Sequence, residues 1–229
     1  MKFYKIKSYA KVNISLGVLG KFKSNLHKIE SLVSFINLYD EIFVKKINNK
    51  DHKIIFYGKF SKRIPKNNTI SNLLKIIDKK LYGQKYLIKV NKRIPQKSGM
   101  GGGSMNASSL LKFLIKSKKL NLSSKELTKI SLKIGSDVII GLQSKTSILY
   151  GNGNLKYLNK NKNKNFYTLL VMPNFGCSTK DIYKNVKIFS KPIFKFNKRI
   201  IISYDFLSNL RNDLEEPAFR KYPILKKVK

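Results

Sequence analysis

A glycine-rich segment constrains the fold of this chain more than any other feature of the sequence. Residues 93–108 read RIPQKSGMGGGSMNAS, and four glycines fall between positions 99 and 103. An alternating strand pattern ends where the segment begins, and a helical pattern over residues 104–116 follows it. Glycine lets backbone N–H groups approach an anion closely, and the N-terminus of the next helix adds a positive dipole end. The segment therefore predicts a phosphate-binding loop.

Two common nucleotide-binding motifs are absent from this segment. It lacks the Gly-Lys-Ser/Thr ending of a Walker A loop, and it is not a G-x-G-x-x-G fingerprint after the first strand. Ser104 could add a hydroxyl ligand to a phosphate oxygen or to magnesium. The alternative interpretation is a flexible glycine turn without a ligand.

Composition indicates a packed protein of a reducing compartment. The chain has 229 residues, of which 42% are hydrophobic, and no apolar run approaches the ~18 residues that span a bilayer. Its first residues resemble no signal peptide, so we expect a cytoplasmic protein without membrane contacts. Cys177 is the single cysteine, which excludes an internal disulfide and, with His27 and His52 alone, a structural zinc site.

The net charge of +36 raises the question of a polyanionic partner. Nearly all of this charge is lysine, which is scattered along the whole chain, whereas arginine is the better residue for base readout. No aromatic signature of an RNA-binding module is present. We attribute the charge to compositional bias and do not expect nucleic acid as a partner, although the charge attracts polyphosphate ligands.

The order of predicted elements indicates an α+β fold with a mixed sheet. Too many strands precede the first helix for a doubly wound sheet. Extended segments are predicted within residues 3–19, at 29–47 with a break near 37–40, at 53–58, 86–94 and 138–158, and a buried strand at 166–173. Helices are predicted at 70–82, 104–116, 124–133 with a capping box of Ser123 and Glu126, and from Ser178. The lysine-rich loop 159–165 divides the chain into domains 1–160 and 166–229.

The residues from Ile94 to Ala107 resemble the phosphate-binding motif of the GHMP kinases, I-P-x-x-x-G-x-G-G-G-S-x-N-A. Other segments resemble, in the same order, those of the diphosphocytidyl-methylerythritol kinases of this superfamily. They are SYAKVNISL (8–16), NLHKIESLVSFINLYDEI (25–42), KIGSDVII (133–140), PNFGCSTKDIY (173–183) and NDLEEPAFRKYPIL (212–225). The resemblance extends over essentially the whole chain.

This resemblance implies a two-lobed fold and a phosphoryl transfer. The N-terminal lobe would be like a domain of ribosomal protein S5, and the C-terminal α/β-plait lobe would be incomplete because the chain stops at Lys229. The implied reaction is ATP- and Mg²⁺-dependent phosphorylation of the 2-hydroxyl of 4-diphosphocytidyl-2-C-methyl-D-erythritol, in the non-mevalonate synthesis of isoprenoid precursors. Asp137 matches the catalytic aspartate, which takes the proton of that hydroxyl, and Lys11 matches the lysine beside it.

The resemblance also implies the binding residues. Those for ATP are Pro95, Gly99, Gly101, Gly102, Gly103, Ser104 and Asn106 around the phosphates, with Asn68 and Lys92 near the adenosine. Those for the substrate are Asn13, His27 at the cytosine edge and Tyr183 against the cytosine face.

Several positions depart from the family pattern. Leu26 stands where the family has a tyrosine beside cytosine, and Lys97 stands where it has the first glycine of the phosphate loop. Tyr9 and Ile139 each replace a proline of the family pattern. None of these changes removes a catalytic group. Because of the short C-terminus, an inactive truncated relative stays open as an alternative, as does a basic RNA-binding protein on a related fold. Homoserine or mevalonate kinase is the nearer alternative, and we expect a monomer or weak homodimer.

Overall fold

The computed structural model describes residues 2–151, 153–158, 166–173, 175–195, 200 and 202–227. The chain divides into two compact units. Unit 1 comprises Met1–Lys11, Ile36–Gln96 and Met100–Ser144, and unit 2 comprises Val12–Phe35, Lys97–Gly99 and Lys145–Lys229. Helices and strands alternate irregularly along the chain, which confirms the predicted α+β class. The predicted domain boundary at 159–165 lies outside the described residues.

Four strands form the sheet of unit 1, namely β1 (Tyr4–Asn13), the C-terminal part of β3 (His27–Ile47), β4 (Lys53–Tyr57) and β5 (Lys85–Asn91). β5 runs antiparallel to β3, from the pair Glu41–Asn91 to the pair Ile47–Lys85, and parallel to β4. β1 also pairs with β3. Side chains therefore alternate between the two faces of this sheet.

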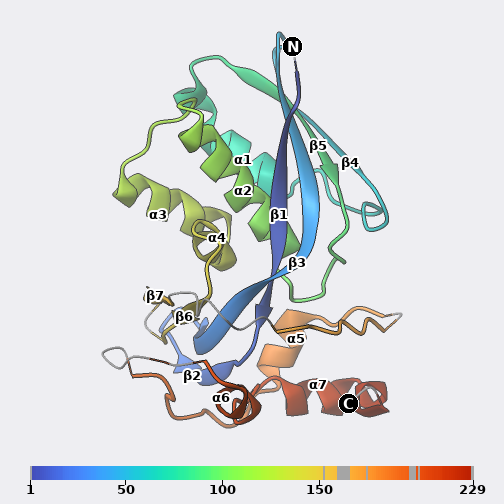
Figure 1. The fold of residues 1–229 in the computed structure, drawn as a ribbon, viewed down its shortest axis with the longest axis vertical. Helices are drawn as coiled ribbons and strands as arrows, with labels where there is room; N and C mark the ends of the chain where they lie inside the picture. Colours follow the sequence, from blue (N-terminus) through green and yellow to red (C-terminus); the bar gives the residue numbers. More distant parts are fainter. Residues whose placement is uncertain are drawn as a thin grey trace. The chain divides into compact units, whose positions relative to one another are not determined.

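Helices cover one face of the unit 1 strands (Figure 1). They are α1 (Thr69–Ile77), the 3-10 helix η1 (Asp78–Leu81), α2 (Gly102–Lys116), α3 (Ser124–Ile134) and α4 (Ser136–Gly141). Ile42, Val44, Ile88 and Val90 of the sheet are buried in one core cluster with leucines of α1 and α2. Burial of this apolar stripe is the main favourable contribution to the stability of unit 1.

Capping residues set where α1 and α3 begin. The predicted box of Ser123 and Glu126 is confirmed at the start of α3, since each side chain hydrogen-bonds the backbone N–H of the other residue. Asn68 caps α1 with a similar box. The helix predicted at 70–82 continues through η1 and ends before Tyr82, which is left-handed.

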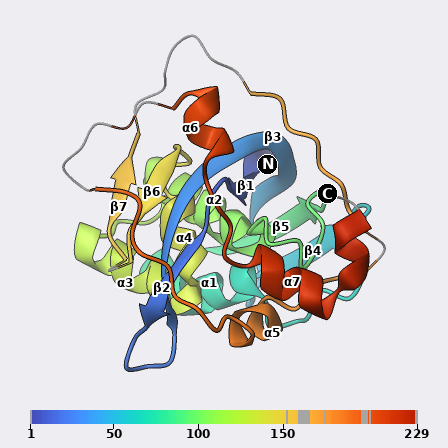
Figure 2. The same ribbon diagram turned by 90° about the horizontal axis from the view of Figure 1, so that it is seen from below.

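Unit 2 is built around the N-terminal part of β3. β2 (Gly17–Lys21) pairs antiparallel with it, and so does β6 (Ser147–Leu149), which forms a hairpin with β7 (Leu155–Tyr157; Figure 2). The helices of the unit are α5 (Thr179–Lys184), α6 (Tyr204–Ser208), α7 (Glu215–Lys221) and the 3-10 helix η2 (Pro223–Lys227). Leu32, Ile148, Tyr150 and Phe194 form one of its apolar clusters.

Two strand predictions within unit 1 are wrong. β3 continues without a break through residues 37–40, because the carboxylate of Asp40 is hydrogen-bonded by backbone N–H groups of Arg93 and Ile94 inside the fold. Residues 138–141 belong to α4 instead of a strand. Gly135 ends α3, and α4 begins at the next residue.

The buried strand predicted at 166–173 is also wrong. Residues 166–173 form neither a helix nor a strand, and their apolar side chains are exposed, Leu169 to 89%. A run of apolar residues predicts a buried strand only where a sheet edge is available to pair with it.

None of the helices in the described part of the chain is long and apolar enough to cross a membrane.

Candidate active site

The predicted catalytic pair, Lys11 and Asp137, comes together in unit 1. The ammonium Nζ of Lys11 lies 3.3 Å from Oδ2 of Asp137, and the lysine side chain is 8% exposed against 31% for the aspartate. Asp137 stands in the first turn of α4. The backbone N–H of Lys11 donates to the carbonyl of Met100 over 3.2 Å, which attaches β1 to the glycine-rich segment. A partly exposed carboxylate thus lies beside a buried cation.

Gly101 brings the backbone against this pair. Its φ of +66° is left-handed, and it is the N-cap of α2. A Cβ at Gly101 would lie 3.1 Å from Cγ of Lys11 and 3.4 Å from Oδ2 of Asp137. Only glycine combines this conformation with so close an approach. The positive end of the α2 dipole therefore lies next to the Lys11–Asp137 pair.

The neighbouring residues of the loop are close to polar groups of other elements. A Cβ at Gly102 would lie 3.3 Å from Nζ of Lys92, and the carbonyl of Gly103 accepts a 2.6 Å hydrogen bond from the hydroxyl of Thr69. A Cβ at Gly135 would lie 3.4 Å from the hydroxyl oxygen of Ser104. Together these contacts fix the first turn of α2 between β5, α1 and α4.

Buried polar atoms without a partner accompany the predicted binding residues. Asn106 is buried on α2, and its Oδ1 has no hydrogen-bond partner among the described residues. In unit 2, Nε2 of His27 is likewise buried and has no partner among them. Burial, followed by the charge of Lys21, lowers the pKa of His27, so its ring is neutral at pH 7. Such atoms favour a ligand that supplies the missing hydrogen bonds.

His27 also contacts the predicted cytosine-stacking residue. The rings of His27 and Tyr183 have centroids 5.0 Å apart and are inclined by 33°. Asn13 donates from Nδ2 to the hydroxyl of Ser31 over 2.7 Å, so its side chain is fixed on β1. Unit 2 therefore brings two of the three predicted substrate residues into direct contact.

Comparison with known proteins decides the family. The family described as "GHMP kinases N terminal domain" matches residues 68–151. The chain is 54% identical over 231 residues to 4-diphosphocytidyl-2-C-methyl-D-erythritol kinase of Pelagibacter ubique (strain HTCC1062), covering 100% of this chain and 81% of that protein. The chain belongs to the 4-diphosphocytidyl-2-C-methyl-D-erythritol kinase family. A Clostridium botulinum member (strain Hall) is 34% identical over 229 residues, 97% of this chain and 81% of its own length.

Solved structures agree with the fold of this kinase family. A crystal structure of 4-(cytidine 5'-diphospho)-2C-methyl-D-erythritol kinase matches 98% of this chain and 81% of its own with a TM-score of 0.70 at 22% identity. Homoserine kinase from Cytophaga hutchinsonii matches 83% of this chain and 62% of its own with a TM-score of 0.56 at 18% identity. The GHMP kinase fold expected from the sequence is confirmed.

One residue beside the phosphate loop of this kinase family member escaped the sequence analysis. Asp40 is fully buried, and its Oδ1 accepts hydrogen bonds from the backbone N–H groups of Arg93 (2.7 Å) and Ile94 (2.9 Å). Its Oδ2 forms an ion pair with the buried ammonium of Lys92. The signal in the sequence was a charged residue inside an apolar strand, which we interpreted as a break.

The two residues predicted near the adenosine differ in what their side chains do. Asn68 accepts from the N–H groups of Ile70 and Ser71 and donates to the carbonyls of Pro65 and Lys66, at 3.1 Å in each case. All its side-chain polar groups are thus used in capping α1. The ammonium of Lys92, by contrast, is paired with Asp40 and lies 3.3 Å from the place of a Cβ at Gly102 in the glycine-rich loop.

The loop before α2 begins at Pro95 and contains an uncommon lysine. Gln96 fixes the start of the loop by donating to the carbonyls of Phe60 (2.8 Å) and Lys62 (2.7 Å). Lys97 has a φ of +54°, a left-handed conformation in which the kinase family pattern has glycine. Gly99 is left-handed as well, with a φ of +73°. Lys97 therefore adopts a backbone conformation that is uncommon for a residue with a side chain.

Proposed function

We propose that this chain transfers the γ-phosphoryl group of ATP to the 2-hydroxyl of 4-diphosphocytidyl-2-C-methyl-D-erythritol, a step in the non-mevalonate synthesis of isoprenoid precursors. One observation carries the proposal. The Lys11–Asp137 pair lies against the glycine-rich loop in a member of the family that is named for this reaction.

Asp137 and Lys11 have different roles in the phosphoryl transfer. The substrate hydroxyl oxygen forms a bond to the γ-phosphorus, the bond from that phosphorus to the β–γ bridging oxygen breaks, and ADP leaves with the electron pair. The hydroxyl proton passes to the carboxylate of Asp137. Lys11 offsets negative charge on the transferring group. Positioning and charge stabilisation supply most of the rate in such transfers.

The phosphate groups fit the N-terminus of α2. Glycines at 101–103 let the first turn of α2 pack closely against Lys11, Ile94 and Thr69, and α2 is long enough, at 15 residues, for a full dipole effect on phosphates at its N-terminus. No group of three or more ligating side chains occurs among the described residues. Ser104 would contribute a hydroxyl oxygen to a magnesium ion bound by ATP, and the ion would neutralise phosphate charge.

The diphosphocytidyl substrate is assigned to unit 2. The neutral ring of His27 offers an unpartnered nitrogen to the cytosine edge, Tyr183 offers a ring face, and Asn13 an amide. We further propose domains at 1–160 and 166–229, a cytoplasmic location, and a monomer or weak homodimer.

Release of ADP from Mg-ATP by the purified chain, with and without the diphosphocytidyl substrate, tests the proposal. Turnover should depend on that substrate, should not occur with homoserine or mevalonate, and should fall at least ~10³-fold in Asp137→Asn. Asp51→Asn is the matched control, because Asp51 is exposed and lies outside the site. If a folded sample shows no turnover, or if Asp137→Asn equals the control, the proposal is wrong.

A further inference from the structure

The face of the unit 1 sheet that faces away from the helices has an unusual composition. Ile42, Val44, Ile88 and Val90 face the helical core. Their neighbours in each strand lie on the opposite face because side chains alternate along a strand. Cross-strand pairs on that opposite face include Phe43 with Lys89. Aromatic rings and lysines thus lie side by side on this face.

Rings and cations contact one another across the strands. Nζ of Lys7 lies 4.7 Å from the ring centroid of Tyr39. Nζ of Lys45 and Nζ of Lys89 lie 5.7 and 5.3 Å from the ring centroid of Phe3. We call the surface formed by Phe3, Lys7, Tyr39, Phe43, Lys45 and Lys89 the basic sheet face. All six side chains are at least partly exposed.

The charge of this surface is almost entirely positive. Its acidic residue, Glu41, has a side chain that is only 8% exposed and forms ion pairs with Lys5 (2.5 Å) and Arg93 (2.6 Å). The hydrogen bond from Lys5 lowers the pKa of Glu41, so this carboxylate is ionised at neutral pH. Among the described residues, no carboxylate forms an ion pair with Lys7, Lys45 or Lys89.

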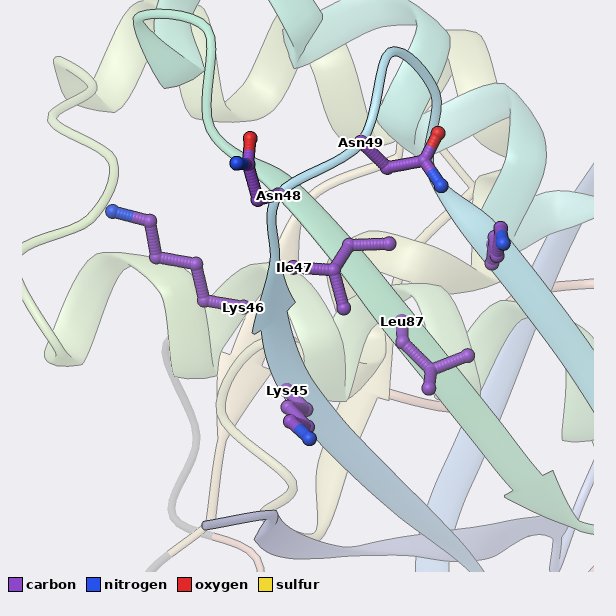
Figure 3. Close-up of a pocket in the computed structure, with 7 residues that line it drawn as sticks. Lys45, Lys46, Ile47, Asn48, Asn49 and Leu87 are labelled. Atoms are coloured by element: carbon purple, nitrogen blue, oxygen red, sulfur yellow. The ribbon is translucent and has the colours of Figure 1, made fainter. Parts of the chain in front are cut away.

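A hollow of about 530 Å³ continues the basic sheet face at the end of β3. Lys45 and Leu87, which pair in register on neighbouring strands, line it together with Lys46, Lys53 and the side chains of Asn48 and Asn49 (Figure 3). Side-chain amides can hydrogen-bond the edge of a base, and ammonium groups can bind phosphates. The hollow is large enough for a nucleobase.

We propose that the basic sheet face binds single-stranded nucleic acid, with phosphates at the lysines and bases stacked on the rings. Lysine alone would suit any polyanion, whereas interleaved rings add affinity only for a ligand with exposed π faces. A duplex hides its base faces, so the rings favour a single strand over a duplex. The scatter of lysines along the sequence argued against such a partner, but the fold gathers several of them around aromatic rings. The proposal is independent of the kinase reaction.

Fluorescence anisotropy with fluorescein-labelled oligo(U) and oligo(dT) of roughly 15 nucleotides tests this proposal on the full chain. The double variant Tyr39→Leu/Phe43→Leu should lose at least about 30-fold in affinity, since it removes two rings and each stacked base contributes ~1–3 kcal/mol. Tyr82→Leu is the matched control, because Tyr82 is 89% exposed at the end of η1. Far-UV circular dichroism verifies that each variant is folded, and Tyr39→Phe, which keeps the ring, should retain the affinity.

A charge-matched pair of variants separates a binding face from general attraction. Lys7→Gln/Lys89→Gln should reduce the slope of log affinity against log salt by about 1.4, at ~0.7 per phosphate contact. Lys125→Gln/Lys129→Gln removes the same charge from exposed positions on α3 and should leave the slope unchanged. Equal losses in both pairs, equal binding of a duplex, retained affinity in the leucine variants, or binding to phosphatidylserine vesicles in place of oligonucleotides would each overturn the proposal.

Discussion

Removal of the Asp40 charge should destabilise unit 1 strongly. In Asp40→Asn, the amide oxygen can still accept from the N–H groups of Arg93 and Ile94, but Lys92 loses its counterion. The side chains of Lys92 and Asp40 are 5% and 0% exposed, so the ammonium cannot reach water without local unfolding. Breaking a buried ion pair in this way costs about 3–5 kcal/mol. Because both backbone hydrogen bonds can persist, we expect the lower end, ~3 kcal/mol.

Replacing both partners should recover part of that loss. Asp40→Asn combined with Lys92→Met removes the unpaired charge and fills its space with an apolar chain of similar length. The double variant should therefore be more stable than Asp40→Asn alone, with a coupling free energy of about 3 kcal/mol or more. Lys92→Met alone leaves the Asp40 carboxylate with its two backbone donors and should fall between the other two.

Urea unfolding followed by far-UV circular dichroism measures these differences, because the chain contains no tryptophan for a fluorescence assay. Asp51→Asn, at an exposed position, controls for the loss of one carboxylate. A stability of Asp40→Asn within ~0.5 kcal/mol of that control, or single losses that simply add in the double variant, would refute the buried ion pair as a stabilising contact.

Three further predictions rest on other contacts in unit 1. Gly101→Ala places a Cβ on a left-handed residue against the proposed catalytic pair, so the KM for ATP should rise and the free energy of unfolding should fall by ~1–2 kcal/mol; unchanged kinetics would contradict this. Ser123→Ala removes the capping box of α3 and should cost ~1 kcal/mol in urea unfolding, whereas Ser123→Asp should not. The hydrogen bond from Lys85 lowers the pKa of Asp78 below its unfolded value of about 3.9, so its contribution is present above that pH and is lost as the pH falls toward the folded-state pKa. Asp78→Asn should therefore reduce the loss of stability between about pH 5 and pH 3, and an unchanged slope would refute the assignment.

Local signals in the sequence predicted the parts of this fold that depend on neighbouring residues. The capping box joins Ser123 and Glu126, which are three positions apart, and the glycine-rich loop follows directly after β5. Both could therefore be located from sequence spacing. The contact of Lys11 with Asp137 is different. It joins residues far apart in the sequence, and only the resemblance to a family indicated it.

Long-range pairing accounts for what the sequence could not predict. Asp40 and Lys92 are 52 positions apart, and a charged residue in a strand indicates a break unless its partner is known. The strand predicted at residues 166–173 is wrong for the converse reason. Apolar composition predicts a strand, but it does not reveal whether a sheet edge is available to pair with it. The gathering of Lys7, Lys45 and Lys89 on one face depends on the register of separate strands, which the sequence does not reveal.

Because β3 is one continuous strand, insertions and deletions within it should be poorly tolerated. This single strand of 21 residues contributes its first part to one unit and its last part to the other. Deleting or inserting one residue near Phe35 would rotate every later side chain to the opposite face of its sheet relative to every earlier one. Ile42 and Val44 would then face water while Phe43 entered the core. Length variation should therefore be tolerated in the turn at residues 22–26, before the strand begins, and rejected throughout the strand itself.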